Sequence, residues 1–95
     1  MNITIKAIHF DVTEKLEQYI EKKLEKIAKT AGEDSNVEVT LKVVKPQTAM
    51  NKEVSITLPY EGKRLYAEKT ADTFEDAVLQ VIDSLRTQME KIKNK

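Results

Sequence analysis

The sequence predicts an α+β fold in which a four-stranded sheet has two helices on one face, in the order β-α-β-β-β-α. Apolar residues recur at every second position in four short stretches and at helical spacing in two longer ones. With 95 residues, the chain is long enough to bury one core and too short for two. We therefore expect a single domain that spans residues 1–95.

The N-terminal third is expected to form a strand and then a helix. Residues 2–8 alternate polar and apolar side chains, which is the period of an extended strand. Residues 11–32 change to helical spacing, and Asp11 or Thr13 can cap the start of this helix while Gly32 ends it. Its apolar stripe consists of Leu16, Ile20, Leu24, Ile27 and Ala31.

Two further strands are expected to pair as a hairpin. Residues 36–45 and 52–58 each place apolar side chains at every second position. Pro46 cannot donate a hydrogen bond to a sheet, so we expect a loop between the two strands. The inward-facing residues would be Val37, Val39, Leu41, Val43, Val54, Ile56 and Leu58.

A fourth strand and a second helix complete the order. Pro59 and Gly62 predict a turn, and residues 63–69 then show a weaker strand pattern. From Thr73 onward the spacing is helical, and Thr73 with Asp76 forms a capping box at the helix start. The apolar line of this helix is Phe74, Ala77, Val78, Val81, Leu85, Met89 and Ile92.

The composition argues against several classes of protein. No cysteine is present, which excludes disulfides and thiolate metal sites and is typical of a reducing compartment. His9 is the only histidine, and we interpret it as a structural or surface residue. Neither a signal peptide nor an apolar run of about 18 residues occurs. We predict a cytoplasmic protein that is not an enzyme, holds no cofactor or metal, takes no small-molecule substrate and contacts no membrane.

The charges are segregated although they sum to zero, with 16 basic and 16 acidic side chains. On a helical wheel, the first helix separates into an acidic flank and a basic stripe. The stripe contains Lys15, Lys22, Lys26 and Lys29, with Lys23 beside it near Tyr19, and the second helix ends with Arg86, Lys91 and Lys93. These faces are either simply solvated or, with Lys42 and Lys45 at the rim, a surface for phosphate groups.

A family resemblance covers nearly the whole chain. It is carried by IHFDVTEKLEQYIEKKLEKI, VEVTLKVVKP and YAEKTADTFEDAVLQVIDSLRTQMEKIKNK, in this order and spacing. The sequence resembles the short ribosome hibernation-promoting factors, also called ribosome-associated inhibitors or ribosomal subunit interface proteins. The resemblance implies a fold like that of a double-stranded-RNA-binding domain.

The function that the resemblance implies is the inhibition of translation in stressed or stationary-phase bacterial cells. Such a protein binds the small ribosomal subunit at 16S ribosomal RNA (rRNA), between head and body. There it occludes the positions of messenger RNA and of the A- and P-site transfer RNAs. Longer members add a C-terminal domain that pairs ribosomes, which we do not expect here, so ribosome dimerisation would need another factor.

The family motifs match this sequence unevenly. The first-helix pattern T-x-x-L followed by K-[LF]-x-K-L matches at Thr13, Leu16, Lys23, Leu24, Lys26 and Ile27, and an L-K-V-x-K pattern matches at Lys42 and Lys45. In the second helix Gln88, Lys91 and Lys93 agree, whereas Arg86 lies one residue early. The resemblance thus implies rRNA contacts through Lys23 and Lys26. We expect both on the helix exterior, where reversal to glutamate would abolish ribosome binding without unfolding the chain.

Two other functions are compatible with the same residues. The first is a self-associating protein–protein interaction module that uses the bare sheet face or an edge strand, with the lysines serving solubility. The second is a general binder of double-stranded RNA. A steep dependence of affinity on salt would separate the RNA-binding functions from self-association.

Overall fold

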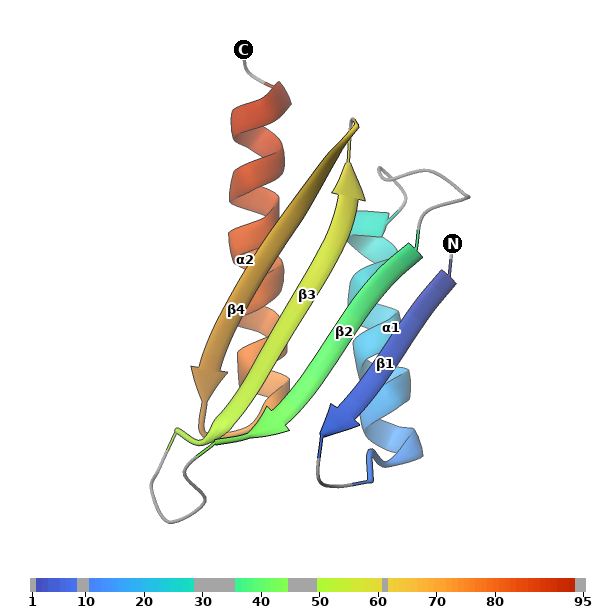
Figure 1. Cartoon of the computed structure of the whole chain (residues 1–95), viewed down its shortest axis with the longest axis vertical. Coiled ribbons are helices and arrows are strands. Elements are labelled where there is room, and N and C mark those ends of the chain that lie inside the picture. The colour runs from blue at the N-terminus through green and yellow to red at the C-terminus, as the bar shows by residue number, and fades with distance from the viewer. Residues whose placement is uncertain (1, 9–10, 29–35, 45–49, 61, 94–95) are drawn as a thin grey trace.

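Four strands and two helices follow one another in the predicted order (Figure 1). The computed structural model describes residues 2–8, 11–28, 36–44, 50–60 and 62–93. The elements are β1 (Asn2–Ile8), α1 (Glu14–Ala28), β2 (Asn36–Val43), β3 (Lys52–Tyr60), β4 (Lys63–Ala71) and α2 (Phe74–Lys93). This arrangement confirms the predicted fold class.

The strands lie in the sheet in their sequence order, β1-β2-β3-β4. β2 pairs antiparallel with β3, which confirms the expected hairpin, and β3 pairs antiparallel with β4. β1 is parallel to β2, from the pair Asn2↔Asn36 to the pair Ile8↔Lys42. Parallel pairing needs a crossover between the strands, and α1 provides it.

Both helices lie on one face of the sheet and run in the same direction (Figure 1). The core between the two layers contains the predicted alternate residues of β2 and β3 except Val43, which is only partly buried, and the apolar lines of both helices as far as these lie within the described residues. Leu41, Ile56 and Leu85 are among its fully buried side chains. Ile3 and Ile5 are only partly buried, because β1 is an edge strand. Neither of the two described helices lies on the opposite face of the sheet (Figure 1).

Threonine side chains cap the start of both helices. The backbone N–H of Leu16 donates to Oγ1 of Thr13 at 3.1 Å, and that of Asp76 donates to Oγ1 of Thr73 at 3.1 Å. Thr13 rather than Asp11 is therefore the cap of α1, and the predicted cap of α2 is confirmed. The predicted helix end at Gly32 lies outside the described residues.

The turn between β3 and β4 is shorter than predicted. Pro59 was expected in the turn but lies within β3, opposite Arg64 of β4. The pairing of β3 with β2 ends at Glu38↔Thr57, so Pro59 lies beyond it and its missing N–H does not interrupt that pairing. Gly62, with φ of 74°, provides the left-handed residue that the turn requires.

Candidate nucleic-acid interface

Three lysines follow one another along the exposed side of α1. Lys15, Lys22 and Lys26 are all exposed, and steps of seven and four residues place them along one line of the helix. The opposite side of α1 packs on the sheet through Ile20 and Leu24, which are fully buried. We call Lys15, Lys22 and Lys26 the α1 lysine band. Its position on the solvent side of the helix allows its ammonium groups to reach phosphate groups of a partner.

The start of α1 lies against the start of α2. A shallow groove of about 380 Å³ is lined there by Thr13, Lys15, Leu16, Tyr19 and Glu75. Burial raises the pKa of Tyr19, and the carboxylates of Glu75 and Asp76 raise it further. These two carboxylates therefore lie near the first turns of α1, at the Lys15 end of the band.

Lys23 differs from the α1 lysine band in its surroundings. It is partly buried, and its Nζ lies 5.6 Å from the centre of the Tyr19 ring, which is a cation–π contact. We expected Lys23 on the helix exterior like Lys26, and the structure corrects this. A helical wheel gives the direction of a side chain around its own axis, but not which neighbouring ring covers it. Lys23 is thus less available to a partner than Lys22 or Lys26.

The cations near the end of α2 point in two directions. Arg86 and Lys91 are both exposed, but five residues separate them, which is about 140° around a helix at about 100° per residue. Arg86 follows Glu75 by eleven residues and so shares the flank that faces α1. Lys91 instead lines a groove beside β4. Lys93 is the last residue of α2.

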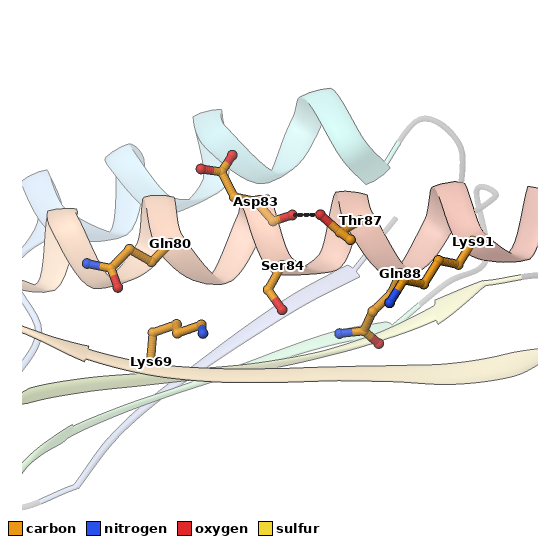
Figure 2. A pocket seen from close by; sticks show the side chains of 7 residues that line it. All are labelled: Lys69, Gln80, Asp83, Ser84, Thr87, Gln88 and Lys91. Atoms are coloured by element: carbon orange, nitrogen blue, oxygen red, sulfur yellow. Dashed lines mark hydrogen bonds between the residues drawn. The ribbon is translucent and has the colours of Figure 1, made fainter.

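The groove between α2 and β4 brings the predicted site residue Lys91 together with six residues that we did not predict as a site (Figure 2). It has a volume of about 460 Å³ and is lined by Lys69, Gln80, Asp83, Ser84, Thr87, Gln88 and Lys91. The side-chain amide of Gln88 donates to the backbone carbonyl of Tyr66 on β4 at 2.9 Å. The sequence contained one indication of this groove. Lys69 follows Leu65 and Ala67 at every second position, so it lies on the same face of the strand as these buried residues, although it is charged.

Lys42 lies on the opposite face of the sheet from the helices. It alternates with Leu41, which is fully buried under the helices, so its side chain is on the open face. The structure therefore does not bring Lys42 together with the α1 lysine band. The other two predicted contacts, Lys29 and Lys45, lie outside the described residues.

On the open face, Lys42 belongs to a row of polar side chains across three strands. Glu53 is its partner in register, and the Tyr66 hydroxyl donates to Oε2 of Glu68 at 2.6 Å. A hydrogen bond with Glu68 raises the pKa of Glu53, whereas the hydrogen bond from Tyr66 lowers the pKa of Glu68. Lys42 acts on both carboxyl groups by lowering their pKa. Of the two carboxyl groups, Glu53 therefore has the raised pKa and Glu68 the lowered one.

Neither a cluster of metal-ligating side chains nor a membrane-spanning helix occurs among the described residues. Among them, no three His, Cys, Asp or Glu side chains are grouped so that they could hold a metal ion. Neither described helix combines the length and the apolar character that a membrane span requires.

Comparison with protein families identifies the relatives of the chain. The model of the family described as Sigma 54 modulation protein / S30EA ribosomal protein matches residues 3–95. The chain belongs to this family. Its members are ribosome-associated modulation factors, so the predicted family is confirmed.

Two of the solved structures that match share the fold over all or nearly all of their length. A ribosomal subunit interface protein from Coxiella burnetii is 22% identical, with a TM-score of 0.85 and 100% of both chains covered. The N-terminal domain of Protein Y from Thermus thermophilus is 20% identical, with a TM-score of 0.79, and the match covers 97% of this chain and 99% of that one. The fold is therefore retained although about four in five residues differ.

Proposed function

We propose that this protein is a cytoplasmic ribosome hibernation factor of stressed bacterial cells. It binds the small ribosomal subunit at 16S rRNA and inhibits translation by occupying the positions of messenger RNA and of the A- and P-site transfer RNAs. It acts by binding, as a single domain, and not by catalysis. The observation that carries this proposal is the family match over residues 3–95.

The α1 lysine band supports rRNA as the partner. Phosphate groups are bound mainly by lysine and arginine, and each such contact releases counterions from the nucleic acid. The three lysines share one exposed line, while the carboxylates of Glu17, Glu21 and Glu25 lie on another flank of α1. A neutral chain can bind a polyanion in this way because it presents one sign of charge over a limited surface.

A protein that inhibits translation by occupying a binding site needs a rigid structure rather than catalytic residues. A domain that blocks a channel must keep its shape when transfer RNA or messenger RNA competes for the space. The core of this protein provides that, since both helices pack against one face of the sheet through side chains that are almost inaccessible to solvent, such as Leu24, Val39 and Leu85.

Co-sedimentation with purified bacterial ribosomes and separated small subunits tests the proposal. We expect near-stoichiometric recovery with small subunits at low salt and a steep loss of affinity as salt is raised. Lys22→Glu combined with Lys26→Glu should weaken binding about tenfold or more and relieve inhibition in a cell-free translation assay. Lys6→Glu combined with Lys63→Glu makes the same change of charge at exposed positions outside the band. Equal binding by the wild type and the band variant would refute the role of the band.

The same experiment distinguishes the two other functions. Protein that stays at the top of the gradient at low salt, but sediments as a dimer or larger species alone, would indicate the self-associating module. Binding to naked duplex RNA as tight as to small subunits would indicate a general double-stranded-RNA binder.

A further inference from the structure

The outer edge of β1 is an unpaired strand edge with exposed apolar surface. β1 is the first strand in the sheet order, so no strand among the described residues pairs with its outer side. An edge strand presents backbone N–H and C=O groups that can pair with a further strand. On the helix-covered face of this edge, Ile3 and Ile5 are only partly buried. A further strand on β1 would therefore form backbone hydrogen bonds and cover apolar surface.

The helix flank over this edge is acidic. α2 contacts β3 and β4, and α1 lies behind β1 and β2 in Figure 1, so the flank of α1 that faces away from α2 lies toward the outer edge of β1. Tyr19 is on the flank that faces α2, because it lines the groove between the two helix starts. Glu17 and Glu21 are each two residues from Tyr19, which is about 160° around the helix. With the exposed Glu14 and Glu25 they form the acidic flank of α1.

The acidic flank argues against a second copy of the chain as the further strand. If β1 paired antiparallel with β1 of another copy, a two-fold axis perpendicular to the sheet would keep both helix layers on the same face. The two copies of α1 would then be neighbours, with their acidic flanks facing each other. Repulsion between the carboxylates would oppose this dimer. RNA is disfavoured for the same reason, because its phosphate groups are also negative.

The same charges favour a basic peptide in an extended conformation. In a strand added to β1, every second side chain would point to the helix-covered face. Lysine or arginine at these positions would cover Ile3 and Ile5 with their methylene groups, and their charged ends would reach the acidic flank. The intervening side chains would lie on the open face beside the exposed Lys6, where a positive charge is unfavourable. The site therefore selects an alternating pattern of basic residues.

We propose that the outer edge of β1 and the acidic flank of α1 form a docking site for an extended segment of a partner protein, which carries lysine or arginine at every second position. The segment adds to the sheet as a fifth strand. Its site is on a different flank of α1 from the α1 lysine band, so the two surfaces can be occupied at once. The inference goes beyond the proposed function and does not depend on it.

A labelled peptide of nine residues, in which lysine alternates with threonine, tests the docking site by fluorescence anisotropy with the whole chain. We expect saturable binding, and binding about fivefold weaker or more for a peptide of the same composition with its lysines in one block. Glu17→Gln with Glu21→Gln should weaken binding of the alternating peptide about fivefold or more. Asp83→Asn with Glu90→Gln removes the same charge from exposed positions of α2 and should bind as the wild type. No binding, or equal binding by the three proteins or of the two peptides, would overturn the proposal.

Nuclear magnetic resonance of the backbone amides locates the bound peptide. We expect shift changes in β1 and along the acidic flank, and unchanged signals in β4, the other edge of the sheet. Changes confined to β4, or to neither edge, would overturn β1 as the docking strand. Sedimentation of the chain without peptide gives the last comparison, since a dimer that perturbs the amides of β1 would make a second copy the occupant. No ribosome takes part in these experiments, so their failure would leave the proposed function intact, and a lack of ribosome binding would leave this inference intact.

Discussion

The two faces of the sheet have opposite chemistry although they share every strand. On the helix-covered face, Leu41 and Val54 are neighbours in register and both are fully buried. One position further along, Lys42 and Glu53 are neighbours on the open face. Burial of apolar surface stabilises the covered face, whereas exposed charge pairs contribute little. The fold therefore depends on one face, and the chemistry of the other can change with little effect on stability.

Truncation on the covered face should have the largest effect on stability. Leu41→Ala should lower the free energy of unfolding by about 2–5 kcal/mol, because it removes transfer energy and leaves a cavity. Its neighbour Thr40 lies on the open face, and Thr40→Ala should cost less than about 1 kcal/mol. Urea unfolding followed by circular dichroism measures both. Similar losses in the two variants would mean that the faces do not differ in the way the burial indicates.

A smaller effect is expected where α2 enters the covered face. Thr73→Ala removes the oxygen that accepts the backbone N–H of Asp76, and should cost about 1 kcal/mol. Thr73→Ser keeps that oxygen and should retain most of the stability. Thermal unfolding of the three proteins gives the comparison. If the alanine and serine variants melt together, the hydrogen bond is not what stabilises the helix start.

The smallest effect concerns the polar row on the open face. Tyr66→Phe removes the hydroxyl that donates to Glu68, so the pKa of Glu68 should rise toward its ordinary value of 4.5. Since the folded-state pKa of Glu68 is lowered, its contribution to stability is fully present above the unfolded-state pKa and is lost as the pH falls through the folded-state pKa. The variant should shrink this contribution.

Carbon-13 nuclear magnetic resonance of the side-chain carboxyl groups follows this titration directly. Tyr60→Phe is the control, because Tyr60 is buried and its hydroxyl is not the donor to Glu68. An unchanged titration of Glu68 in Tyr66→Phe would argue against the hydrogen bond.

Most of the fold could be predicted because local periodicity and tertiary burial agree. The period of two in residues 36–43 and 52–58 identified most buried side chains of β2 and β3, although Val43 is only partly buried and the buried Tyr60 was missed. Pro59 was wrongly predicted to lie in the turn. A proline does not destabilise a strand at a position where no neighbouring strand accepts a hydrogen bond from its backbone nitrogen. Local sequence does not show where the pairing with β2 ends.

The candidate site was harder to predict because it depends on how elements face one another. The alternation of side chains along a strand was enough to predict that Lys42 lies on the other face of the sheet from the helical lysines, because it is adjacent to the buried Leu41. The contact of Lys23 with Tyr19 and the groove around Lys69 depend instead on side-chain conformations and on the packing of α2 against β4. A helical wheel contains no information about either.

The hydrogen bond from Gln88 to the carbonyl of Tyr66 has a consequence for colloidal stability. A protein with zero net charge has little long-range repulsion to keep its copies apart at high concentration. β4 is an edge strand of nine residues, and such an edge is a template for intermolecular sheets. By occupying one carbonyl of that edge, Gln88 opposes intermolecular pairing at short range, where the charge of the molecule as a whole provides no protection.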